Sequence, residues 1–155
     1  MKFFISHKKE DEPSALLIAL ELRKLGIPYY LDTLDNAVAR SGKELTDHIK
    51  SNLNDCTEIL VVISQQTRYS QWVPFEVGMA AQKDLPTATF LQEDTTLPDF
   101  LEYWPRLKKP SDISKYVQIK RRAELEYSTH FHMDHYVQAR SLTDRFYSML
   151  KAELQ

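Results

Sequence analysis

Trp72 and Glu76 stand four positions apart at the start of a segment that reads as a helix opening near Ser70. Residues at this spacing lie one above the other on a helix face, so an indole ring is expected beside a carboxylate. Such a pair at a crevice is a candidate for chemistry. The alternative is structural: Trp72 packs in the core, and Glu76 is a solvated carboxylate of the first turn, favoured by the helix dipole.

The element before this helix determines where the pair would lie. The run ILVVIS at Ile59–Ser64 is continuously apolar, as is typical of a strand buried on both faces of a parallel sheet. A polar loop joins it to the helix. The pair would therefore lie just beyond the carboxyl end of a strand, where open α/β sheets bind ligands.

The first two-thirds of the chain alternates strand and helix. Strands are expected at Lys2–Ser6, Pro28–Asp32, from Glu58 to Ser64 and at Pro86–Leu91, and helices from Pro13 to Gly26, from Ser41 to Asn54 and from Ser70 onward. This alternation with short links predicts right-handed crossovers and a parallel, doubly wound sheet.

The pattern weakens beyond Gln92. Leu97–Leu101 is expected to form a helical turn, Ile113–Ile119 a fifth strand, and the segment from Ala139 to Leu154 a last amphipathic helix. The polar and aromatic stretch from 121 to 134 matches no single pattern. The whole chain, 1–155, is expected to be one domain.

Composition excludes several functions. The 155 residues are 43% hydrophobic and 27% charged, and the net charge of -2 provides no basic field for nucleic acid. The single cysteine, Cys56, lies on an apolar helical stripe and is expected to be a buried structural thiol. The chain has three glycines, and their positions form neither a G-x-G-x-x-G motif nor a P-loop, so both of these phosphate-binding loops are excluded. No signal peptide or membrane-spanning segment is expected, which predicts a cytoplasmic protein with no membrane partner.

Four motifs in order resemble a bacterial TIR (Toll/interleukin-1 receptor) domain. They are Phe4-Ile5-Ser6-His7 with acids shortly after, Tyr30-Leu31-Asp32 at the end of the second strand, Ala39-Arg40-Ser41-Gly42 in the loop that follows, and Ser70-x-Trp72-Val73-x-x-Glu76 at the start of a helix. The resemblance covers residues 1 to about 91, and 92–155 diverge from the family apart from a general fit.

The resemblance implies a flavodoxin-like three-layer α/β sandwich with five parallel strands in the order 2-1-3-4-5. Two other families share that architecture. A response-regulator receiver needs an acceptor aspartate where Ile63-Ser64 stands, and a flavodoxin needs a phosphate loop where His7-Lys8-Lys9 stands. This chain therefore lacks the residues that carry the chemistry of either family.

The resemblance also implies an activity. Many TIR domains cleave NAD+ at the nicotinamide–ribose bond, giving ADP-ribose or a cyclic ADP-ribose-type signal, and the essential glutamate matches Glu76. NAD+ is then the substrate, and no cofactor is implied. By the same resemblance, residues near the ligand are Ser6, His7, Lys8, Asp32, Ser70 and Trp72. For Ser6, His7, Lys8 and Asp32, a plain surface or backbone-capping role is the alternative.

Relatives of this size often serve in bacterial antiphage defence, some with a downstream effector that senses the product. Related enzymes work as homo-oligomers in which the BB loop, here Leu34 to Gly42 and including Arg40 and Ser41, completes a neighbour's pocket. The second hypothesis is a non-catalytic TIR module that only builds such assemblies.

Three of the five histidines spell T-H-x-H-x-D-H, the zinc motif of metallo-β-lactamase-like hydrolases, with His130, His132, Asp134 and His135. Alternating histidines and an aspartate are suitable zinc ligands. The further downstream ligands of that fold do not fit in the roughly twenty residues that remain. We therefore expect no metal site, with these histidines solvated or packed.

Overall fold

The computed structural model describes residues 1–31, 42–91, 95–128 and 135–155, and the side chains of its last helix from residue 142 onward. The strands are β1 (Phe3–Ser6), β2 (Tyr29–Leu31), β3 (Glu58–Ile63), β4 (Thr87–Leu91) and β5 (Arg106–Leu107). The helices are α1 (Glu12–Lys24), α2 (Gly42–Asn54), α3 (Trp72–Gln82), α4 (Asp112–Ser128) and α5 (His135–Glu153), with short 3-10 turns η1 (Lys9–Asp11) and η3 (Asp99–Leu101).

The five strands form one sheet in the order β2-β1-β3-β4-β5, and every neighbouring pair is parallel. This confirms the flavodoxin-like topology. Central β3 is buried along its whole length, as its apolar run predicts. Because all strands point the same way, their carboxyl ends share one edge of the sheet and their amino ends share the other.

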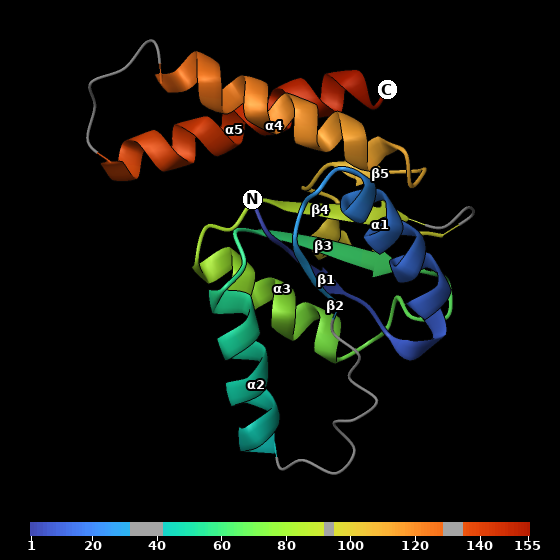
Figure 1. Cartoon of the computed structure of the whole chain (residues 1–155). Helices are drawn as coiled ribbons and strands as arrows, with labels where there is room; N and C mark the ends of the chain where they lie inside the picture. The colour runs from blue at the N-terminus through green and yellow to red at the C-terminus, as the bar shows by residue number, and fades with distance from the viewer. Residues whose placement is uncertain (32–41, 92–94, 129–134) are drawn as a thin grey trace.

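Helices cover both faces of the sheet (Figure 1). On one face, α1, α4 and α5 pack with the sheet in one apolar core, and α5 lies against α4. On the other face, α2, α3 and η3 form a second core. The chain therefore has the expected three layers, helices–sheet–helices.

The fifth strand is not where the sequence pattern placed it. Ile113–Ile119 belongs to α4, and β5 is the short segment Arg106–Leu107 before it. The buried residues of α4 follow helical spacing: Asp112, Ile113, Tyr116, Val117, Lys120 and Ala123. The sequence pattern failed here because a short apolar segment does not by itself distinguish a strand from a helix.

The helix boundaries agree with the local signals, with one shift. Pro13 lies in the first turn of α1, and Gly26 follows that helix with a φ of +67°, a conformation that favours glycine. Helix α3 begins at Trp72, so Ser70 precedes it instead of opening it.

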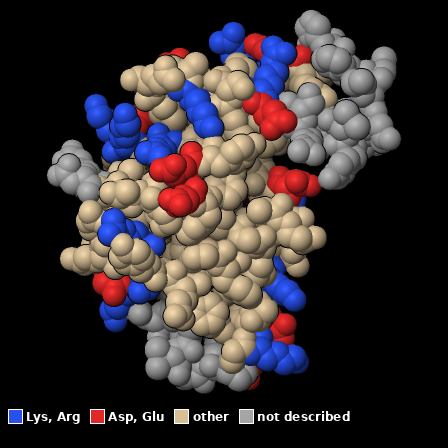
Figure 2. Space-filling view, turned by 180° about the vertical axis from the view of Figure 1, so that it is seen from behind, with Lys and Arg blue, Asp and Glu red and all other residues tan. Residues whose placement is uncertain are grey.

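Charged side chains are intermixed on the face seen in Figure 2, and a broad area in the middle of that face carries few of them. Helix α3 contains a single charged residue, Glu76, and that residue is buried. Within the described ranges, no helix combines the length and apolar composition that a bilayer-spanning segment needs.

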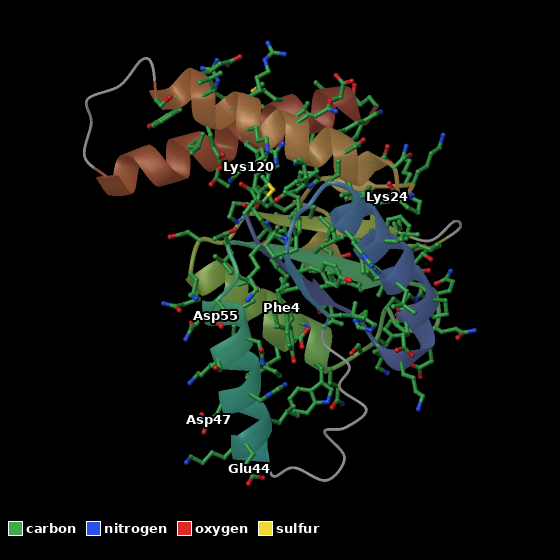
Figure 3. All side chains as sticks on the ribbon, viewed as in Figure 1. Phe4, Lys24, Glu44, Asp47, Asp55 and Lys120 are labelled. Atoms are coloured by element: carbon green, nitrogen blue, oxygen red, sulfur yellow. The ribbon has the colours of Figure 1, made fainter. Side chains whose placement is uncertain are left out.

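A buried carboxylate ties the amino end of β3 to α4. The hydroxyl of Tyr116 donates to Glu58 Oε2 at 2.5 Å, and Lys120 Nζ lies 3.7 Å from Glu58 Oε1. Figure 3 shows Lys120 between α4 and the sheet. Burial raises the pKa of Glu58 to about 7, while the Lys120 ammonium and the Tyr116 hydrogen bond act in the opposite direction.

This pKa predicts how stability changes with pH. The folded state holds the Glu58 proton more tightly than the unfolded state does, so this stabilisation is present at low pH and is lost as the pH rises through about 7. Between about pH 5 and about pH 8, the loss should approach ~3 kcal/mol of unfolding free energy. Glu58→Gln should remove this slope in urea titrations, whereas Glu10→Gln, at an exposed position that does not contact Glu58 or Lys120, should keep it. Equal slopes in wild type and Glu58→Gln would contradict the assignment.

Candidate active site

The candidate site centres on a hydrogen bond between residues 70 positions apart. Ser6 is the last residue of β1, and its hydroxyl donates to Glu76 Oε2 on α3. Both side chains are fully buried. A buried carboxylate needs a donor to offset its lost hydration, and Ser6 provides one.

The structural alternative for the Trp72–Glu76 pair is wrong. Glu76 is 0% exposed, whereas Trp72 is 37% exposed. The buried stripe of α3 runs through Val73, Glu76, Val77 and Ala80, so Glu76 lies in the middle of the buried face and Trp72 at its margin. The Trp72 ring packs edge-to-face on Phe75, with centroids 6.0 Å apart.

Ser70 organises the entry to α3. It is buried, its hydroxyl accepts a hydrogen bond from Val73 N at 3.4 Å, and its own N–H donates to Thr67 O at 2.8 Å. These contacts are those of a residue that positions a helix start. Its expected role in substrate binding stays a prediction.

His7 and Lys8 follow Ser6 at the carboxyl end of β1. His7 is 1% exposed, so the alternative that it is a surface residue is wrong. Its Nδ1 lies 3.2 Å from Ile5 O, and since a carbonyl only accepts, Nδ1 carries the hydrogen in this contact. Lys8 is half-buried.

A second buried carboxylate joins the two loops that flank this edge. Thr67 donates its hydroxyl hydrogen bond to Asp11 Oδ2, 56 positions away, and its Oγ1 accepts from Ser64 N at 3.0 Å. Asp11 belongs to η1 after β1, and Ser64 follows β3. The first sequence motif includes Asp11 only as a nearby acid, and no motif indicated Thr67. The S-x-x-T spacing of Ser64 and Thr67 is the local signal for this turn.

Several predicted residues lie outside the described residues. They are Asp32, Arg40 and Ser41, together with His130, His132 and Asp134 of the histidine motif. Gly42 is described as the exposed first residue of α2, and a β-carbon added there would meet no atom within 4 Å. His135 is described only as the first residue of α5. Among the described residues, no cluster of His, Cys, Asp or Glu is arranged to hold a metal ion.

Cys56 lies between α2 and β3, beyond the helix on whose stripe the sequence pattern placed it, at the amino edge of the sheet and away from Ser6. It is buried, and burial raises the pKa of its thiol. A buried thiol with a raised pKa is a poor nucleophile, which agrees with the expected structural role.

The family model of the TIR domain matches residues 3–129. The chain belongs to the TIR domain family. The match runs past residue 91, into the region where the sequence motifs are sparse. A comparison with curated proteins found no match.

Two solved structures resemble this TIR domain at 13% identity. A 2-deoxyribosyltransferase from Bacillus psychrosaccharolyticus has a TM-score of 0.59 and covers 75% of this chain and 92% of its own. The TIR domains of the activated Roq1 resistosome, which directly recognises the pathogen effector XopQ, have a TM-score of 0.45. That match covers 97% of this chain and 81% of the resistosome chain. At this identity, the first likeness shows a shared fold.

The Asp11–Thr67 bond predicts a stability loss at this edge. Thr67→Val keeps the side-chain shape but leaves the buried Asp11 carboxylate without this donor, at an expected cost of about 1–3 kcal/mol in unfolding free energy. Urea unfolding measures the change. Thr96→Val, at an exposed position, is the matched control and should change stability by less than about 0.5 kcal/mol. A Thr67→Val protein as stable as wild type would show that the bond contributes nothing.

Proposed function

We propose that this TIR domain cleaves NAD+ at the nicotinamide–ribose bond and that Glu76 is the essential carboxylate. The observation that carries the proposal is the Ser6–Glu76 hydrogen bond, because it holds an acidic group at the carboxyl edge of a parallel sheet. Family membership supports it, since TIR domains include NAD-cleaving enzymes as well as scaffolds.

One carboxylate is sufficient for this reaction. An ordinary glycosidase needs a second acid to protonate its leaving oxygen. The nicotinamide of NAD+ already carries a positive charge and leaves as a neutral molecule when the C–N bond breaks, with both bonding electrons staying on nitrogen. The ribose that remains is oxocarbenium-like, and an ionised Glu76 near its hydroxyls would stabilise that charge.

The neighbouring residues suit the rest of the substrate. In this proposal, the exposed ring of Trp72 stacks on the nicotinamide or the ribose. Ser6 orients Glu76 through its hydroxyl, and His7 and Lys8 lie next to it in the chain, toward the ribose and the diphosphate. Asp32, at the end of the second strand, and Ser70 complete the proposed binding set.

The fate of the ribosyl cation determines the product. Water gives ADP-ribose, and attack by an atom of the same molecule gives a cyclic ADP-ribose-type signal. We further propose that the protein acts in the cytoplasm in bacterial antiphage defence, an immune signalling role in which a downstream effector senses the product.

Burial of Glu76 bears directly on this proposal. With the carboxylate fully shielded from solvent, NAD+ reaches it only if part of the surrounding structure moves aside. We therefore propose that the described conformation is a resting state and that self-association through the BB loop opens or completes the pocket. Activity should then depend on assembly as well as on Glu76.

The decisive variant is Glu76→Gln, which keeps the side-chain size and removes the charge. NAD+ cleavage should fall by at least about a hundredfold, because the developing cation loses its stabilising charge. Ser6→Ala should reduce it by about tenfold through the lost hydrogen bond to a charged group. Mass spectrometry of products from concentrated protein measures both, and Glu102→Gln, on an exposed carboxylate, is the control.

The same burial favours a second candidate, a TIR module that assembles without catalysis. In that case Glu76 is an interior residue that joins α3 to β1. The exposed Trp72 and Phe75 would then serve contacts with other chains. Absence of turnover at every protein concentration, including with crowding agents, would favour this module over the enzyme.

A substitution at the end of the BB loop separates assembly from folding. Gly42 is exposed, and an added β-carbon meets no atom there, so Gly42→Arg should leave the melting temperature unchanged. If the loop builds the assembly, the wild-type activity per molecule should rise with protein concentration, and Gly42→Arg should lose most of that rise, by about tenfold. Light scattering follows assembly in parallel. Ser51→Arg adds the same charge on an exposed position of α2 and should behave as wild type.

A further inference from the structure

A hollow lies at the opposite edge of the sheet from Ser6 and Glu76. It has a volume of about 330 Å³, and its walls come from the end of α3, the segments that lead into β4 and β5, and α5. Asp84 and Thr87 lie at the amino end of β4, and Tyr103 and Trp104 precede β5. None of the described candidate active-site residues lines it.

Three aromatic rings form walls of this hollow. The Tyr103 ring stands nearly perpendicular to both neighbours: its centroid is 5.9 Å from that of Trp104 at 81° and 6.4 Å from that of Tyr147 at 88°. Tyr103 is 62% exposed and Tyr147 only 7%. These are edge-to-face contacts between the rings, and ring faces attract cations. Tyr103 already accepts one such contact, because Lys151 Nζ lies 5.3 Å from its ring centroid.

The charged and polar groups of the lining also suit a cation. Asp84 and Asp144 both line the hollow, and none of the described lining residues is basic. Within the described part of the chain, neither aspartate forms an ion pair. The buried Tyr147 hydroxyl accepts from Thr87 N at 2.7 Å.

The backbone holds one of the two aspartates in an uncommon conformation. Asp84 has a φ of +54°, in the left-handed region that few residues other than glycine adopt. Its N–H donates to Ala81 O at 3.0 Å in the turn after α3. Leu85 N also donates to Ala80 O at 3.0 Å, so this turn is a Schellman motif that ends α3 and fixes the backbone from which the Asp84 side chain extends.

The lining excludes several classes of ligand. Two carboxylates repel phosphates and other anions. A hard divalent cation needs about six oxygen ligands and gains nothing from ring faces. A neutral apolar molecule would leave the aspartates unused. A volume of about 330 Å³ is at the small end of ligand sites, so the occupant is a small molecule.

We propose that this hollow binds a small organic ammonium ion, whose alkyl groups contact the rings of Tyr103, Trp104 and Tyr147 and whose charge is balanced by Asp84 and Asp144. The proposal is independent of NAD+ cleavage, since the two sites lie at opposite edges of the sheet and have none of their described residues in common. It gives this TIR domain a binding site for a second kind of molecule.

Calorimetric titration of the full chain with choline chloride tests the proposal, in phosphate buffer at low ionic strength because Tris is itself an organic ammonium. Choline should bind saturably, and its neutral isostere 3,3-dimethylbutan-1-ol should bind at least about tenfold more weakly, since only the charge differs. A parallel titration with putrescine compares a primary ammonium with a methylated one. Saturable binding of either cation supports the site.

Variants assign the binding to this hollow. Tyr103→Ala at an exposed ring, and the double change Asp84→Asn with Asp144→Asn, should each weaken binding by about tenfold. Asparagine tolerates a positive φ, so the turn at position 84 is preserved. Asp55→Asn, an exposed aspartate elsewhere, should bind as wild type does. Circular dichroism confirms that each variant is folded.

Three results would overturn the proposal. The first is no saturable binding of either cation up to about 10 mM. The second is equal affinity for choline and its neutral isostere, which would indicate an apolar hollow without charge recognition. The third is undiminished binding by folded Tyr103→Ala and the double aspartate variant, which would place the cation elsewhere.

Discussion

A carboxylate can be buried only where a donor meets it, and this constraint shapes the molecule around three acidic residues. Glu76 accepts a hydrogen bond from the Ser6 hydroxyl, and Asp11 accepts one from the Thr67 hydroxyl. Glu58 accepts one from the Tyr116 hydroxyl. Each bond joins residues more than fifty positions apart. Without its donor, each of these buried carboxylates would destabilise the folded state. With the donor, each holds a helix or loop against the sheet.

The three acids divide between the two edges of the sheet. Glu76 and Asp11 lie at the carboxyl edge, where β1 and β3 end and where α/β proteins bind ligands. Glu58 lies at the amino edge, where it fastens α4 with the help of Lys120. The aromatic hollow lies at the amino ends of β4 and β5. The candidate chemistry and the proposed ammonium site are therefore separated by the length of the strands.

Burial of Glu76 links the two proposed functions. A carboxylate held inside by Ser6 is positioned, but it is closed to a substrate as large as NAD+. In an enzyme whose pocket opens only on assembly, the same contacts between chains that a scaffold makes would also turn on catalysis. The uncharged exposed surface of α3, with Trp72 at its start, suits either interpretation. The two candidates thus differ in whether assembly exposes Glu76 to substrate.

Local sequence patterns determined most of the elements and their order, because helix and strand periodicity, the proline of α1 and the glycine after it act over a few residues. They failed at Ile113–Ile119, where a short apolar run fits both a helix and a strand. The motif indicated Glu76, but only the fold decided that this side chain is buried and that Trp72 lies at the margin. That outcome depends on Ser6, seventy positions away, and no local pattern reports a bond across such a distance.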